Sequence, residues 1–234
     1  MATSPIAVHL GTTASTQDDA RRLFEGEPLV VTAARQTAGR GRTGAKWVDA
    51  DRALAASVAF RPAWPEASWG RIPLVAGLAA VDSLPGVGLK WPNDVVRDGE
   101  KIAGILSEAS DGVVVVGMGV NLWWRRPLEG AGSLWPDDRG IDEARAIGEA
   151  WASRLIERMA RGSEDWGHAE YQGRCVLIGE ALTWEPDGHG VATGVDAFGR
   201  LIVDVEGELV ALESGAVRTV RSREPGARNR DDGR

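Results

Sequence analysis

The 234-residue sequence has a single cysteine, Cys175, and no hydrophobic run long enough to cross a membrane. One cysteine cannot form an internal disulfide, which favours the reducing cytoplasm. The longest apolar runs, near 102–106 and 113–120, fall far short of the roughly 20 residues that a membrane helix needs. The N-terminus lacks a basic stretch followed by an apolar core, so it does not resemble a secretory signal. We therefore expect a cytoplasmic protein that does not associate with a membrane.

Lysine is scarce, although the chain has many basic residues. Only three of its 27 basic residues are lysines, Lys46, Lys90 and Lys101, and the rest are arginines. A lysine kept against this background indicates a position that needs a compact ammonium rather than a planar guanidinium. Chance placement is the alternative, but all three lie within glycine-rich motifs. The net charge of -7 argues against a protein whose main task is to coat nucleic acid.

The rest of the composition is ordinary for a globular protein, with 43% hydrophobic and 26% charged residues. A short helix is predicted after its cap at Ser15, and a buried apolar helix over 71–84. Asp-Gly pairs at 98–99 and 111–112 indicate hairpins. Other patterned segments are strands over 28–34, 53–60 and 113–122 and helices over 142–159 and 164–172. Strands joined by tight turns predict an α+β fold with a mixed or largely antiparallel sheet.

Towards the C-terminus the sequence changes to short strand-like segments separated by glycine-rich turns. Six such segments, from CVLIG at 175–179 to AVRTV at 216–220, occupy about 45 residues, which is typical of a small barrel. The final residues are charged and lack large apolar side chains, so a disordered tail is predicted. These features predict a larger domain, a small barrel domain and a tail, at residues 1–172, 173–222 and 223–234.

The segment GRGRTG at 39–44 has the form G-x-G-x-x-G. A dinucleotide site would need a helix directly after it, but a turn and a strand follow. A P-loop would need a lysine where Ala45 stands. Glycines let a backbone approach a ligand closely, and Arg40 and Arg42 can bind phosphate through paired hydrogen bonds. The segment therefore indicates an anion cradle, with a flexible basic loop as the alternative.

Three further motifs carry polar residues into a predicted sheet. KWPND at 90–94 combines a turn with a strand-embedded Lys90, although Pro-Asn-Asp is also ordinary turn chemistry. KIAGILSE at 101–108 opens on Lys101. Its Gly104 marks the close approach of a ligand, or else a bulge. GMGVNL at 117–122 ends a strand on an asparagine.

Taken together, GRGRTGAKW, KWPND, KIAGILSE and GMGVNL, with Ser15 and Thr16 upstream, resemble the biotin protein ligases, also called biotin–acetyl-CoA-carboxylase ligases. The resemblance covers about residues 10–220, and the first three motifs are highly characteristic in this order. It implies a class II synthetase-like α+β catalytic domain followed by an SH3-like barrel. It also implies a reaction in which biotin and ATP form biotinyl-5′-AMP. The biotinyl group then passes to a lysine of a carrier-protein domain.

The resemblance also assigns roles to individual residues. Lys101, Arg40 and Arg42 would be catalytic, stabilising the anions that meet in the transition state. The implied biotin-binding set is Ser15, Thr16, Gln17, Gln36, Gly39, Arg40, Gly41, Arg42, Lys101 and Gly104. The implied ATP-binding set is Arg40, Arg42, Lys90, Asn93, Asp94, Asn121, Trp123 and Arg218, with Asp94 a partner of ATP-bound Mg²⁺. The implied protein partner is the biotin carboxyl carrier domain of acetyl-CoA carboxylase or a related acyl-CoA carboxylase.

Two departures from the family pattern stand out. Ala45 replaces a loop arginine that the family usually has, and Gln17 stands where asparagine is common. Because only 14 residues precede Ser15, we expect no DNA-binding winged helix and no DNA partner. We also expect a monomer or weak homodimer. A lipoyl-protein ligase and a non-catalytic biotin-binding regulator of the same fold are the alternatives. A lipoyl-protein ligase would not explain the Ser/Thr/Gln set, because lipoate has no ureido ring for these residues to bind. A non-catalytic regulator would not explain why Lys101 and the two arginines are intact.

Overall fold

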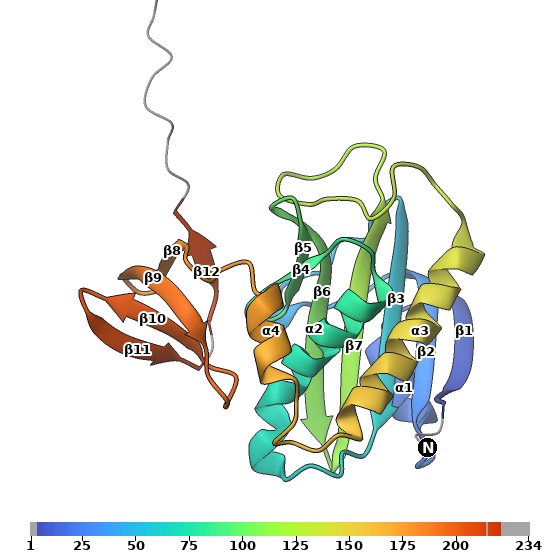
Figure 1. Ribbon diagram of the computed structural model, residues 1–234. Coiled ribbons are helices and arrows are strands. Elements are labelled where there is room, and N and C mark those ends of the chain that lie inside the picture. The colour runs from blue at the N-terminus through green and yellow to red at the C-terminus, as the bar shows by residue number, and fades with distance from the viewer. Residues whose placement is uncertain (1–3, 214, 221–234) are drawn as a thin grey trace, which may run out of the picture.

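The computed structural model describes residues 4–213 and 215–220 and is built on two separate sheets (Figure 1). The larger sheet has seven strands in the order β1-β2-β3-β7-β6-β5-β4. Their bounds are β1 Ile6–Thr13, β2 Leu29–Gln36, β3 Arg52–Phe60, β4 Gly88–Lys90, β5 Asp94–Arg97, β6 Glu100–Ser110 and β7 Val113–Trp123. Only β1 and β2 pair in parallel, and the other neighbours are antiparallel. The α+β prediction with a mixed sheet is therefore confirmed.

The two Asp-Gly hairpins form where they were predicted. Asp98 and Gly99 have φ of 53° and 79°, and Asp111 and Gly112 have φ of 55° and 73°. Positive φ at both central residues matches the right-handed twist of the flanking strands, and Asp-Gly tolerates it better than most pairs. The turns connect β5 to β6 and β6 to β7, so the KIAGILSE and GMGVNL motifs become neighbouring antiparallel strands.

Helices cover both faces of the larger sheet (Figure 1). The helix α1, Thr16–Leu23, packs through Ala20 against one face in a small cluster that includes Leu29 and Val31. On the other face lie α2, Ile72–Ser83, and α3, Ile141–Met159, in the main core with Val30. Leu29 and Val31 point to the small cluster and Val30 points to the main core. Successive side chains of a strand face opposite sides of the sheet, so β2 is buried on both faces.

The smaller sheet has five antiparallel strands in the order β11-β10-β9-β8-β12. Their bounds are β8 Ala181–Trp184, β9 Gly188–Val195, β10 Leu201–Val205, β11 Glu208–Leu212 and β12 Val217–Thr219. The predicted strand over 175–179 is wrong, because only Cys175 makes a bridge, to Leu89, and turns follow. The predicted helix over 164–172 forms later, as α4, His168–Arg174. The predicted tail at 223–234 lies outside the described residues.

The β9–β10 loop of the smaller sheet is bonded to the rest of the chain. The indole N–H of Trp91 donates to the carbonyl of Gly199 at 2.9 Å, and that of Trp166 donates to the carbonyl of Ala197 at 2.9 Å. Arg71, in the 3-10 helix η2 (Glu66–Arg71), also donates to Ala197. These buried donors hold the smaller sheet beside the β4 end of the larger one.

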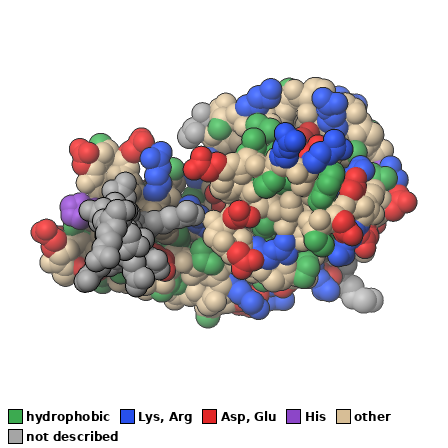
Figure 2. All heavy atoms as spheres, turned by 90° about the horizontal axis from the view of Figure 1, so that it is seen from above, with side chains coloured by type: hydrophobic (Ala, Val, Ile, Leu, Met, Phe, Trp, Pro, Cys, Tyr) green, Lys and Arg blue, Asp and Glu red, His purple; other side chains and the backbone are tan. Residues whose placement is uncertain are grey.

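Seen from above in Figure 2, basic and acidic side chains are interspersed over the part of the molecule built on the larger sheet. Within the described residues, no helix combines the length and the apolar character that spanning a membrane requires.

Candidate active site

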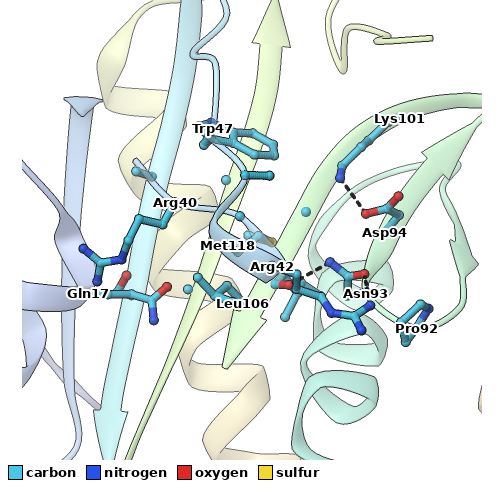
Figure 3. A pocket seen from close by; sticks show the side chains of 18 of the residues that line it. Gln17, Arg40, Arg42, Trp47, Pro92, Asn93, Asp94, Lys101, Leu106 and Met118 are labelled. Atoms are coloured by element: carbon cyan, nitrogen blue, oxygen red, sulfur yellow. Dashed lines mark hydrogen bonds and ion pairs between the residues drawn. The ribbon is translucent and has the colours of Figure 1, made fainter. Parts of the chain in front are cut away.

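One cavity of about 430 Å³ brings most of the predicted site residues together (Figure 3). It lies over the middle of the larger sheet, and residues 215–217, which lead into β12, close one side of it. The predicted residues that line it are Ser15, Thr16, Gln17, Gln36, Arg40, Gly41, Arg42, Lys90, Asn93, Asp94, Lys101 and Gly104. Gly39 is buried next to it, where a Cβ would lie 3.0 Å from Gln36 Nε2.

A cluster of neutral polar groups forms one end of the cavity. The backbone N–H and the hydroxyl of Thr16 both donate to Gln36 Oε1, at 2.8 and 3.0 Å, and the Thr16 and Ser57 hydroxyls are 2.8 Å apart. The Gln36 backbone N–H donates to Asp49 at 2.8 Å, and burial raises the pKa of that carboxyl. These groups leave hydroxyl and amide atoms for a neutral polar ligand. Ser57 was not foreseen in the sequence, where it reads as one residue of an apolar strand.

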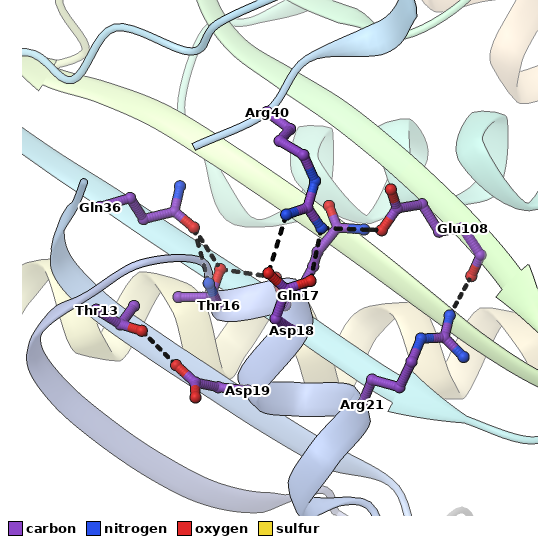
Figure 4. A network of polar contacts seen from close by, with 10 residues as sticks. Thr13, Thr16, Gln17, Asp18, Asp19, Arg21, Gln36, Arg40 and Glu108 are labelled. Atoms are coloured by element: carbon purple, nitrogen blue, oxygen red, sulfur yellow. Dashed lines mark hydrogen bonds and ion pairs between the residues drawn. The ribbon is translucent and has the colours of Figure 1, made fainter. Parts of the chain in front are cut away.

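Arg40 lies in the cavity wall, but its guanidinium turns towards a network on the surface (Figure 4). Two of its N–H groups donate to the carboxylate of Asp18 at 2.7 and 2.9 Å, and Glu108 lies 3.5 Å away. Gln17 Nε2 donates to the same Glu108 oxygen at 2.7 Å. The hydrogen bonds from Arg40 lower the pKa of Asp18. Neither carboxylate was recognisable from sequence patterns as a partner of Arg40.

Arg42 and Asn93 connect the glycine-rich loop to the KWPND turn. Arg42 Nη1 donates to Asn93 Oδ1 at 3.0 Å. The Asn93 amide in turn donates to the backbone carbonyl of Ile105 at 3.0 Å, and the Ile105 N–H donates to the Asn93 carbonyl at 2.9 Å. Both motifs are therefore fixed to β6, the strand that carries Lys101.

Lys101 approaches the cavity from the side opposite Arg40 (Figure 3). Its Nζ lies 2.6 Å from Asp94 Oδ1, and 5.6 Å from the centre of the Trp47 ring. Among the described lining residues Asp94 is the only carboxylate, against five cations: Arg40, Arg42, Lys46, Lys90 and Lys101. Such a cavity has a positive potential and is suited to a ligand with several negative charges.

Trp47 lies across two glycines, a placement that the motif alone did not reveal. Gly104 on β6 pairs with Gly119 on β7. A Cβ would lie 2.9 Å from the Trp47 ring at Gly104 and 2.6 Å from it at Gly119. The two missing side chains therefore make a flat apolar bed within the sheet. Met118 and Leu106 also line the cavity.

Besides Gly39, three predicted residues do not line this cavity. Asn121 is buried at the end of β7, where its amide donates to the carbonyl of Lys101 at 3.1 Å and its Oδ1 has no partner among the described residues. Trp123 ends β7 and pairs with Arg52. Arg218 lines a separate cavity of about 380 Å³ beside β8, although its neighbours Ala216 and Val217 line the main one.

Comparisons with known proteins relate most of the chain to one family. A family model, the biotin/lipoate A/B protein ligase family, matches residues 12–122. The chain is 36% identical to a biotin–(acetyl-CoA-carboxylase) ligase of Mycobacterium tuberculosis, over 82% of this chain and 79% of that one. It is 32% identical to the protein of that name from Paracoccus denitrificans, over 83% of this chain and 92% of the relative. A structure of an Aquifex aeolicus biotin protein ligase with biotin and ATP superposes with a TM-score of 0.77 at 26% identity. The superposition covers 93% of this chain and 99% of that one.

The family match and the fold thus define an acyl-group ligase of the biotin and lipoate class. Within that class, the chain belongs to the biotin protein ligase family.

Proposed function

We propose that this protein is an ATP-dependent ligase that converts biotin to biotinyl-5′-AMP. It then transfers the biotinyl group to a lysine of the carrier domain of acetyl-CoA carboxylase or a related acyl-CoA carboxylase. The observation that carries the proposal is that Arg40, Arg42 and Lys101 line one cavity that also holds neutral hydroxyl and amide groups. A vitamin with a neutral ureido head and a carboxylate tail, next to a triphosphate, needs this division of polarity.

In the first step a biotin carboxylate oxygen bonds to the α-phosphorus of ATP, and pyrophosphate leaves with the electrons of the broken P–O bond. Anions meet, so the barrier depends on cations that are in place before reaction. Lys101 is assigned to the carboxylate and the new acyl phosphate, and Arg42 to the phosphates. Arg40, which lines the cavity, joins them when the ligand competes with Asp18 for its guanidinium.

The biotin head is assigned to the neutral end of the cavity. Ser15, Thr16 and Gln36 supply hydroxyl and amide groups for the ureido oxygen and N–H groups, with Gln17 beside them. The apolar fused ring and chain are assigned to the apolar side of the cavity, beside the Trp47 ring that rests on Gly104 and Gly119. Gly39 and Gly41 let the loop backbone come close to the ligand.

The adenine is assigned to Asn121 and Trp123. The Oδ1 of Asn121, which finds no partner in the described part of the chain, suits the exocyclic amine of adenine, a hydrogen-bond donor. Trp123 supplies a ring on which a base can stack. Lys90 and Asn93 support the phosphates from the KWPND turn. For Arg218 the proposal requires a rearrangement around β12, because its side chain now lines another cavity.

Mg²⁺ usually accompanies ATP and is bound through one or two carboxylates together with phosphate oxygens. The described residues contain no group of three or more potential metal ligands. A single cavity carboxylate, Asp94, fits a metal that the nucleotide largely holds, and the ion would offset phosphate charge there. In the second step the carrier lysine nitrogen bonds to the acyl carbon, the acyl–oxygen bond breaks, AMP leaves and the amine proton passes to water.

Biotin-dependent exchange of labelled pyrophosphate into ATP tests the proposal, with lipoate run beside biotin. We expect exchange with biotin and little with lipoate. Exchange with lipoate alone would assign the protein to the lipoyl ligases of the same family. Binding of biotin without exchange would favour a non-catalytic regulator.

A further inference from the structure

A second cavity, which we call the side cavity, adjoins the main one. It lies between η2 with the start of α2, the KWPND turn with β6, and the smaller sheet. Six residues line both cavities: Arg42, Trp91, Pro92, Asn93, Ile105 and Leu106. Arg42 and its partner Asn93 therefore stand between the two spaces.

The size of the side cavity limits what it can hold. Its volume is about 160 Å³, against about 430 Å³ for the main cavity. Sites for small-molecule ligands usually occupy about 300–1,000 Å³. The side cavity is therefore too small for biotin or a nucleotide, but it suits one long side chain.

The lining chemistry suits a lysine in particular. Pro73, Leu74 and Leu106 give apolar walls on which a methylene chain can pack. Among the described lining residues the charged groups are Arg42, shared with the main cavity, and Glu213, which is exposed just after β11. A carboxylate at the exposed end attracts an ammonium. Farther in, the cations of the main cavity favour the neutral amine, which is the form that attacks an acyl group.

We propose that the side cavity is the path by which the carrier lysine reaches the acyl phosphate, with Glu213 attracting its ammonium at the outer end. This inference rests on the proposed function, because it names where the second substrate approaches the same site. Glu213, just after β11, would therefore interact with the lysine of the carrier domain and not with biotin or ATP.

Two variants test this path by different means. Glu213→Arg reverses the charge at its outer end. Gly70→Phe adds a ring to its wall at a position where a Cβ would meet no atom within 4 Å, so the backbone has room for it. Glu208→Gln, on exposed β11, is the matched control for a lost carboxylate. Each full-length protein is assayed for biotin-dependent pyrophosphate exchange and for transfer to a purified carrier domain of acetyl-CoA carboxylase.

We expect Glu213→Arg to raise the KM for the carrier domain by about fivefold or more, beyond what an exposed charge pair usually gives. Gly70→Phe should lower kcat/KM for transfer at least about tenfold, because the ring obstructs the lysine. Exchange should stay within about twofold of wild type in all three proteins, since the adenylate forms in the main cavity. Glu208→Gln should transfer normally.

Transfer at the wild-type rate by both Glu213→Arg and Gly70→Phe, with exchange intact, would overturn the path while leaving the proposed function standing. Loss of exchange and transfer in equal proportion in both variants would also overturn it, because the residues would then serve adenylation. A wild-type protein without biotin-dependent exchange would instead contradict the proposed function itself.

Discussion

At the scale of single residues, Lys101 is the clearest link between structure and chemistry. It sits on a rigid strand, with its ammonium held 2.6 Å from Asp94 and its side chain beside the Trp47 ring. A charge fixed before the reaction stabilises a transition state without reorganisation. Because Asp94 already accepts from the ammonium, the lysine is oriented when substrates arrive.

Removing the Lys101 ammonium should slow adenylation far more than it weakens binding. We expect Lys101→Ala to lower the rate of biotin-dependent exchange by about 10²–10³-fold, or ~2.7–4 kcal/mol of transition-state stabilisation. Lys101→Arg, which keeps the charge, should retain a larger share of the rate. Arg61→Ala removes an exposed charge outside the cavity and serves as the control. A Lys101→Ala protein within tenfold of wild type would contradict the assigned role.

The Asp18–Arg40 pair makes a second prediction. Releasing Arg40 from Asp18 should favour its contact with phosphate, so Asp18→Asn should lower the KM for ATP by about two- to fivefold, the range for an exposed pair. The pKa of Asp18 is lowered below 3.8 by its hydrogen bonds from Arg40. A lowered pKa means that the pair is intact above that value and is lost only as the pH falls through the lowered pKa. The effect should therefore be constant between about pH 6 and 9, and a KM ratio that varies across this range would contradict it.

The sequence motifs singled out the cations that line the cavity but not the partners of those cations. Arg40, Arg42 and Lys101 stood out because each lies in a glycine-rich motif in a chain poor in lysine. Asp18 lies on α1 and Glu108 on β6, and acidic residues at such positions usually face solvent. Nothing in their spacing along the chain indicates that both contact Arg40. Such contacts depend on tertiary geometry, which a linear pattern does not contain.

At the scale of secondary-structure elements, the paired glycines of β6 and β7 determine where Trp47 can lie. Gly119→Ala places a Cβ 2.6 Å from the Trp47 ring, so the ring must move from the cavity floor. We expect the KM for biotin to rise about tenfold with little change in melting temperature. Gly11→Ala on β1, where a Cβ would meet nothing within 4 Å, is the matched control. An unchanged KM for biotin would contradict the placement of biotin along this bed.

Three helices are joined by one buried guanidinium. Arg158 on α3, only 6% exposed, contacts Asp82 on α2 and Glu170 on α4 at 2.7–2.8 Å. Removing one partner of a buried ion pair lowers the free energy of unfolding by about 3–5 kcal/mol. Because Asp82 and Glu170 are partly exposed, we expect a value near the lower limit of that range. Arg158→Ala should therefore lower the melting temperature by roughly 6–12 °C. Arg154→Ala removes an exposed pair with Glu157 and should have almost no effect. Equal melting temperatures for the two variants would contradict this reasoning.

Hairpins and long helices were predictable from the sequence because local chemistry determines them. Asp98-Gly99 and Asp111-Gly112 formed turns as expected, and α3 follows its amphipathic pattern. The first strand, β1, was not predicted, because its residues alternate weakly and Ile6 is 57% exposed. It is a strand because β2 supplies a parallel partner. Residues 175–179 read as a strand, but they form turns between α4 and the smaller sheet.

At the scale of the whole molecule, buried indole donors tie the smaller sheet to the larger one. Trp91 and Trp166 are each 2% exposed and donate to carbonyls of the β9–β10 loop. The acceptor carbonyls belong to Gly199, which is half-buried, and Ala197, which is exposed, so each hydrogen bond contributes about 0.5–1.5 kcal/mol. The two sheets should therefore unfold together, which keeps residues 215–217 over the cavity.

Urea unfolding, followed by circular dichroism and tryptophan fluorescence, tests this coupling. We expect one transition for the wild type and two for the double variant Trp91→Phe, Trp166→Phe, with the smaller sheet unfolding first. Trp124→Phe is the control, because the Trp124 indole N–H has no partner among the described residues. Two transitions in the wild-type protein would contradict the coupling.

We propose that three cations from neighbouring segments meet where the biotin carboxylate joins the nucleotide. A crystal structure with a non-hydrolysable biotinyl-AMP analogue would show whether they do. We expect Lys101 Nζ and the guanidinium groups of Arg40 and Arg42 within about 4 Å of the phosphate or the acyl oxygen, with Arg40 released from Asp18. An analogue bound elsewhere, or bound in the cavity with Lys101 and both arginines turned away from it, would contradict this placement.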